Sequence, residues 1–278
     1  MNLTETQINA ADGTLLMVRH AIPQNFKRLA ILVHGLGEHS ARYAEMAGFF
    51  NSKGFAVFTL DHRGHGLSGG RRAHVDTFSD YISDLLIVTK KASAMTGKKR
   101  FFMLGHSMGG LIATLFAGSK PELLDGLVLS SPFFGFAEKV PIYKAIPGKI
   151  LSGLMPTLSM ATGLDPNVIS HDKNVVNAYA SDPLTLKTVT TRWFTEAKKA
   201  QEEAKNAVQK YKGPLLVMQA GDDKLVSPST TQEVFELSQS NPKEFHMLEG
   251  FYHEIFNEVE RAKPYGLLDK WLNSVIGV

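Results

Sequence analysis

A serine stands at the centre of a glycine-flanked pentapeptide, Gly105-His106-Ser107-Met108-Gly109. The apolar run FFML precedes it and the helical pattern GGLIATLFAG follows it, so the serine falls on a predicted strand-to-helix turn. Small residues allow such a turn to be sharp, and the start of the following helix directs free amide hydrogens at a developing negative charge. The pattern predicts that Ser107 is a nucleophile and that the amide of Met108 helps to bind an oxyanion.

A serine hydroxyl is a weak nucleophile at neutral pH, so this chemistry needs a base and a carboxylate that orients the base. Two later loops supply candidates. Gly221-Asp222-Asp223-Lys224 follows the apolar run PLLVMQA, and Tyr252-His253-Glu254 follows EFHML. The order of serine, acid and histidine is the one expected when the nucleophile lies on a strand-to-helix turn. We therefore predict that His253 is the general base. Either Asp222 or Asp223 could be the carboxylate that orients it.

An earlier glycine-rich loop, His34-Gly35-Leu36-Gly37-Glu38-His39, follows the apolar run LAILV. It fits the loop that gives the second oxyanion donor, which would be the amide of Leu36. Each such donor typically contributes about 3 kcal/mol to lowering the barrier. The histidines of this region also suggest a metal site, but their spacing matches no helical ligand pair such as HExxH. We expect neither a metal nor an organic cofactor.

The elements that must position these residues alternate along most of the chain. After an N-terminal hairpin pattern, apolar runs of strand length are separated by helical patterns up to residue 131 and again from residue 214. Continuously apolar strands separated by helices predict a mostly parallel, doubly wound sheet covered on both faces, an α/β fold. The catalytic loops then lie at strand ends, where open α/β sheets bind their ligands.

The alternation stops between residues 136 and 210, where a long polar helix pattern occurs and no strand-like run precedes residue 214. A stretch of this length is too long for a loop. We therefore predict a core domain of residues 1–135 and 211–278, with a helical cap insertion of residues 136–210 over the sheet edge.

The first part of this cap is rich in apolar side chains, among them Ile150 and Leu154. We predict that these two residues bind substrate as the wall of an acyl tunnel; packing of this segment on the core is the alternative. Transient contact of the cap with a membrane surface is a further expectation. Pro147, Pro156 and Lys149 argue against a membrane span.

Composition and charge exclude other classes. The chain of 278 residues has 44% hydrophobic and 21% charged residues, no Cys and a net charge of +3. Basic residues cluster only at 71–72 and 98–100, too few for nucleic-acid binding. The start MNLTETQINA lacks the basic and apolar regions of a signal peptide, and we expect a cytoplasmic protein.

Several motifs together resemble the monoacylglycerol lipase and lysophospholipase-like branch of the α/β hydrolases. They are HGLGEHSARY, DHRGHGLSGGRR, GHSMGG, the Asp-Asp-Lys-Leu-Val loop, the Tyr-His-Glu triplet and, in the cap, DPNVISHDKNVVNAYASDPL. The resemblance covers nearly the whole chain and implies the α/β-hydrolase fold. It implies a triad of Ser107, Asp223 and His253, since Asp223 is the residue before Lys-Leu-Val, and oxyanion amides from Leu36 and Met108. The implied activity is ester hydrolysis of a single-chain lipid, monoacylglycerol foremost, through an acyl-serine.

Three other functions stay open: a general short-chain carboxylesterase, an aminopeptidase on the same fold and a binding protein that kept the pocket. An aminopeptidase needs acidic cap residues around a free amino group. Glu196, Glu202 and Glu203 lie in a Lys-rich helix pattern that is typical of a solvated face. A dehalogenase is disfavoured, because that chemistry requires Asp where this chain has Ser107.

Overall fold

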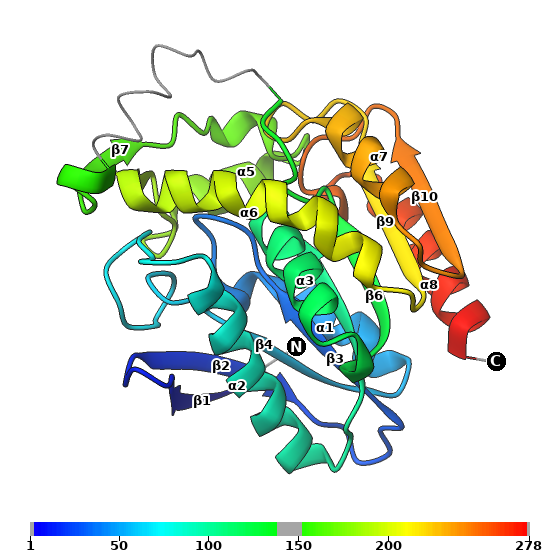
Figure 1. Ribbon diagram of the computed structural model, residues 1–278. Helices are drawn as coiled ribbons and strands as arrows, with labels where there is room; N and C mark the ends of the chain where they lie inside the picture. Colours follow the sequence, from blue (N-terminus) through cyan, green and yellow to red (C-terminus); the bar gives the residue numbers. More distant parts are fainter. Residues whose placement is uncertain (1–2, 138–151, 277–278) are drawn as a thin grey trace.

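An eight-stranded sheet with the order β1-β2-β4-β3-β5-β6-β9-β10 forms the centre of the computed structural model, which describes residues 3–137 and 152–276 (Figure 1). The strands are β1 (Thr4–Asn9), β2 (Leu15–Ala21), β3 (Arg28–Val33), β4 (Phe55–Leu60), β5 (Phe101–His106), β6 (Leu124–Ser130), β9 (Leu215–Ala220) and β10 (Lys243–Leu248). β2 pairs antiparallel with β1 and with β4, and every other pair is parallel. The predicted mostly parallel sheet is present.

Helices cover both faces of the sheet, which explains why β4 and β5 are buried at every position. Alternate residues of one strand enter two separate cores: Ile31 packs in one and Leu32 in the other. The first core is closed by α2 (Ser79–Thr96), α3 (Met108–Ser119), α6 (Thr191–Lys210) and α7 (Pro228–Leu237). The second is closed by α1 (Ala44–Ser52) and α8 (Ala262–Ile276).

The described part of the predicted cap lies in the upper part of Figure 1. It contains η3 (Pro166–Val168), α5 (Lys173–Ser181) and a ribbon in which β7 (Ser159–Ala161) pairs antiparallel with β8 (Thr188–Thr190). The ribbon corrects our expectation that the segment between residues 136 and 214 contains no strand. Each of its strands has three residues, too few to show an alternating pattern in a sequence.

Helix α6 joins the cap to the core. Its alanine face, including Ala197, Ala200 and Ala204, packs in the first core, and a Cβ on Gly118 of α3 would come 2.7 Å from the Ala207 Cα. The two helices therefore approach closely, and α6 contributes to the core although we assigned it to the cap. The domain division itself stays a prediction. Within residues 3–137 and 152–276, neither α6 nor any other helix has the length and apolar character to cross a bilayer.

Candidate active site

Ser107 occupies a sharp turn between β5 and α3. Its backbone has φ 53° and ψ −119°, a region that non-glycine residues enter at a cost of about 1–3 kcal/mol. Two backbone bonds hold it there: its amide donates to the Ser130 carbonyl at 3.0 Å, and its carbonyl accepts from the Phe133 amide at 2.9 Å. The strand-to-helix turn predicted from the pentapeptide is therefore present.

The glycines beside this turn are required by close backbone approaches. A Cβ at Gly105 would lie 2.3 Å from the Gly109 carbonyl oxygen, and one at Gly109 would lie 2.1 Å from the Val33 carbonyl oxygen. Both distances are shorter than any van der Waals contact. Any side chain here would push β3, β5 and α3 apart and displace Ser107.

Asp223 and His253 form a buried pair. The Nδ1 of His253 donates to Oδ2 of Asp223 at 2.7 Å, and Oδ1 of Asp223 accepts from the amides of Leu225 at 2.9 Å and Val226 at 3.0 Å. The neighbouring Asp222 is exposed. The structure thus brings Asp223 and not Asp222 to the histidine. With the proton on Nδ1, Nε2 is the nitrogen that can accept a proton.

The interaction favours the charged form of each partner: it lowers the pKa of Asp223 and raises the pKa of His253. Burial raises the pKa of Asp223, but the charge of His253 and the hydrogen bonds from His253, Val226 and Leu225 outweigh it and leave the pKa below its usual value. Burial lowers the pKa of His253, but the charge and hydrogen bond of Asp223 outweigh that effect, so this pKa lies above 6.5.

The oxyanion loop lies against the serine. A Cβ at Gly35 would come 3.2 Å from the Ser107 Cβ and 2.9 Å from Oε1 of Glu38, so the absence of a side chain at this position lets the loop approach the serine closely. Leu36 and Ser107 line the same cavity. Met108 is the first residue of α3, and an amide in the first turn of a helix has no acceptor within that helix. Both predicted donor amides therefore flank the serine.

Ser107 and His253 open into a cavity of about 570 Å³, a volume typical of ligand-binding sites. Its described lining is mainly apolar, and the side chains that contribute are Leu36, Phe133, Phe136, Met160, Ala161, Leu164, Ile169, Val189, Trp193, Phe194, Leu225 and Val226. The polar lining residues include Glu38, His106, Tyr179, Lys224 and Glu254. The cavity therefore has a mainly apolar lining that also includes the serine and several polar residues.

Of the two residues predicted to bind substrate, Leu154 is not among the residues that line this cavity, which corrects the prediction for this residue. Leu154 is 77% exposed, and Ile150 lies outside the described residues. Val189 and Trp193 take the place expected for Leu154. The sequence pattern did not reveal Trp193 because α6 is polar overall; the apolar pair Trp193-Phe194 near its start was the available signal. It did not reveal Val189 because β8 has only three residues.

The comparisons with known proteins agree with this geometry. A family model described as "Serine aminopeptidase, S33" matches residues 24–260. Human monoglyceride lipase is 34% identical over 252 residues, which cover 90% of this chain and 83% of that protein. The chain belongs to the monoglyceride-lipase-like α/β hydrolases.

Two further relatives extend this assignment. Phospholipase YtpA from Bacillus subtilis is 35% identical to this hydrolase over 237 residues, covering 84% of the chain and 91% of the relative. The crystal structure of Paleococcus ferrophilus monoacylglycerol lipase has a TM-score of 0.83 at 28% identity and covers 99% of this chain and 100% of that one. The α/β-hydrolase fold expected from the motifs is confirmed.

Proposed function

We propose that this hydrolase cleaves the ester bond of single-chain lipids, monoacylglycerol foremost. The observation that carries the proposal is that Ser107 and His253, which is paired with Asp223, line a mainly apolar cavity of about 570 Å³. The apolar lining suits an acyl chain, and the polar lining residues suit the ester and its glycerol. The similarity to human monoglyceride lipase supports the same substrate class.

In the proposed reaction, His253 accepts the hydroxyl proton of Ser107 while the serine oxygen attacks the ester carbonyl. Asp223 keeps the imidazole in its orientation and stabilises the imidazolium. The amides of Leu36 and Met108 donate to the oxyanion, each contributing about 3 kcal/mol. His253 then returns the proton to the leaving glycerol, and water repeats the cycle on the acyl-serine.

The rate is expected to fall on acidification through the pKa of His253, because a protonated imidazole cannot accept the serine proton. Asp223, Glu254 and Glu38 raise this pKa above 6.5 against the effect of burial. The neighbouring His106 stays neutral in this range, since burial lowers its pKa to about 4. The half-maximal kcat/KM should therefore lie above pH 6.5.

A profile of kcat/KM between about pH 5 and pH 9 measures this fall in rate on acidification. Activity should be present above the pKa of His253 and lost below it. A rate that stays constant from about pH 5 to pH 8 contradicts the general-base role.

An aminopeptidase needs a carboxylate free to bind the substrate's amino group, and none of the described residues that line the cavity offers one. Glu196 pairs with Lys199 at 2.5 Å and Glu202 with Lys205 at 2.8 Å, and neither glutamate lines the cavity. The carboxylates among its described lining residues are Glu38 and Glu254, and both are paired with Arg42. A substrate ammonium would have to compete with that guanidinium, so the cavity favours an ester over a peptide.

One experiment separates the functions. The protein is treated with a fluorophosphonate probe and assayed on a monoacylglycerol, on 4-nitrophenyl butyrate and on a proline amide, with Ser107→Ala as background. We expect labelling and hydrolysis of both esters without hydrolysis of the amide. Labelling with turnover of the butyrate alone would indicate a short-chain esterase. A protein that takes no label and turns over none of the three would be a binding protein.

We also propose that the cap makes transient contact with membrane surfaces. Leu154, Met155 and Leu158 are neighbouring apolar side chains on the exposed side of the cap, and exposed apolar clusters of this kind support surface binding. Replacement of Leu154 and Met155 by Ser should reduce co-sedimentation with phosphatidylcholine vesicles; unchanged sedimentation would contradict the contact. The cytoplasmic location stays a prediction from the sequence.

A further inference from the structure

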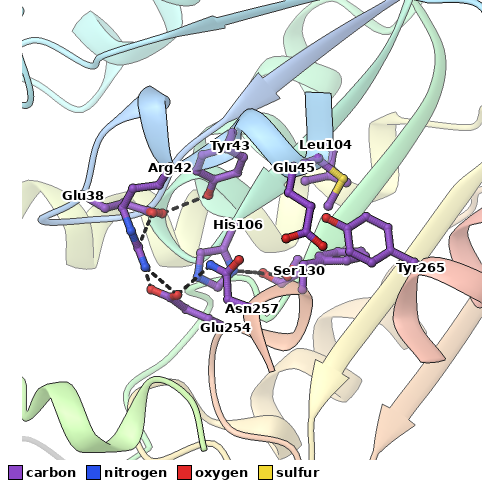
Figure 2. A pocket seen from close by; sticks show the side chains of 12 residues that line it. Glu38, Arg42, Tyr43, Glu45, Leu104, His106, Ser130, Glu254, Asn257 and Tyr265 are labelled. Atoms are coloured by element: carbon purple, nitrogen blue, oxygen red, sulfur yellow. Dashed lines mark hydrogen bonds and ion pairs between the residues drawn. The ribbon is translucent and has the colours of Figure 1, made fainter. Parts of the chain in front are cut away.

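Three charged residues beside the site transfer no proton and donate no hydrogen bond to the oxyanion in the reaction described above. Glu38 and Arg42 belong to the HGLGEHSARY motif, and Glu254 follows His253. Figure 2 shows their side chains converging at a small cavity of about 30 Å³, with Tyr43 and His106 close by. Buried charges are rare and are normally retained only where they are paired, so the partners of these three indicate what they do.

Glu38 holds the peptide that precedes the oxyanion donor. Its Oε1 accepts from the Gly35 amide at 2.6 Å and from the Tyr43 hydroxyl at 2.9 Å. Its Oε2 accepts from Nη1 of Arg42 at 2.6 Å. Because Gly35 directly precedes Leu36, the carboxylate fixes the loop from which the Leu36 amide is presented.

Arg42 connects this loop to the loop of the base. Its Nη1 and Nη2 donate to the two carboxylate oxygens of Glu254 at 2.8 Å each, across 212 residues of sequence. Asn257 in η4 (Ile255–Asn257) donates to the same carboxylate at 2.8 Å. One guanidinium thus joins the loop after β3 to the loop after β10, two strands that are not neighbours in the sheet.

The charged groups of this network form ion pairs with one another: Arg42 pairs with both Glu38 and Glu254. Burial raises the pKa of Glu38, but the charge of Arg42 and the hydrogen bonds from Gly35 and Tyr43 outweigh it and leave this pKa below its usual value. Arg42 lines the small cavity and is not among the described residues that line the larger one. Arg42 can therefore influence a substrate only through the residues it holds.

We propose that Arg42 is a positioning residue: by bridging Glu38 and Glu254, it keeps the Leu36 amide and the His253 imidazole in a fixed relation around Ser107. The proposal rests on the roles given to those residues under the proposed function. The transition state needs the oxyanion donor and the base at the same moment. A misplacement of about 1 Å in such a site can lower the rate by about 100-fold.

The test compares Arg42→Gln with Arg63→Gln. Arg63 is a matched control, since the side chains of Arg42 and Arg63 are 13% and 14% exposed and Arg63 binds the Asp84 carboxylate through two donors at 2.6 and 2.7 Å. Both variants lose a largely buried ion pair and should show a lower Tm. The acylation rate is measured on 4-nitrophenyl butyrate, a small activated ester that requires little beyond the serine, the base and the oxyanion amides.

We expect Arg42→Gln to lower kcat by about 30-fold while KM changes by less than about 2-fold, because geometry and not binding is lost. The affinity for an alkyl boronic acid, which forms a tetrahedral adduct with the serine, should fall by a similar factor. Arg63→Gln should leave both quantities within about 2-fold of the wild type. Glu38→Gln combined with Arg42→Gln should cost little more than Arg42→Gln alone, because residues of one network are not additive.

The proposal is overturned if Arg42→Gln loses no more kcat than Arg63→Gln, or if its loss lies in KM alone. Should Arg42→Gln fail to fold, Arg42→Lys replaces it, because lysine keeps the charge but cannot form the bidentate hydrogen bonds. Its kcat and KM are compared with those of Arg63→Gln in the same way, and we expect kcat to fall by about 10-fold. A wild type that hydrolyses 4-nitrophenyl butyrate but no monoacylglycerol contradicts the proposed substrate. The role of Arg42 is then still decided by comparing Arg42→Gln with Arg63→Gln on 4-nitrophenyl butyrate.

Discussion

Asp223→Asn is expected to lower kcat by about 10⁴-fold, which corresponds to about 5.5 kcal/mol. The Nδ1 of His253 donates to this carboxylate at 2.7 Å. An asparagine can present its NH₂ to Nδ1 instead, which moves the imidazole proton to Nε2. The histidine then carries a proton on the nitrogen that must accept one from Ser107. The asparagine carbonyl can still accept from Leu225 and Val226, so the loop should stay folded.

Asp222→Asn is the matched control for this prediction. Asp222 is exposed, and its amide donates to the Phe251 carbonyl at 3.1 Å, a bond that the substitution keeps. We expect its kcat to stay within about 3-fold of the wild type. Steady-state kinetics of the wild type, Asp223→Asn and Asp222→Asn on one ester shows which aspartate is the acid of the triad. If Asp222→Asn were the more damaging change, the acid of the triad would be misassigned by one residue.

The second large effect concerns the acyl chain. We expect kcat/KM to rise by at least about 100-fold from butyryl to dodecanoyl monoglycerol, or roughly 2.7 kcal/mol. Each methylene buried in an apolar cavity contributes about 0.8 kcal/mol, so eight more could contribute about 6 kcal/mol if burial were complete. The cavity of about 570 Å³ and its apolar wall support burial of such a chain. Incomplete burial and the cost of ordering the chain account for the smaller expected gain.

Val189→Trp should remove most of this dependence. Val189 is buried in β8 and lines the cavity, so an indole there would occupy the volume of a long acyl chain. The butyryl ester should be turned over as before and serves as the internal control. Substrates are used below their micelle threshold, because self-association hides the trend. A wild type that is indifferent to chain length would indicate a general short-chain esterase.

The sequence by itself determined the features that depend on local backbone geometry. The turn at Ser107 needs glycine at positions 105 and 109, because a Cβ there would overlap backbone atoms. The same local logic, apolar runs of strand length between helical patterns, predicted the parallel sheet and the edge at which the loops meet. The resemblance of the Asp-Asp-Lys-Leu-Val loop to the family's motif then favoured Asp223 over Asp222, and the hydrogen bond from His253 to Asp223 is consistent with that choice.

Only the tertiary structure decided which side chains meet across long separations. Leu154 and Val189 are both apolar cap residues, yet the first is exposed and the second lines the cavity. β7 and β8 are too short to show a pattern and form because they pair with each other. Arg42 and Glu254 are 212 residues apart, and no local preference signals their bond. In the sheet, β5, β6 and β9 separate β3 from β10, so the contact forms only because the folded loops after these two strands reach each other across the edge of the sheet.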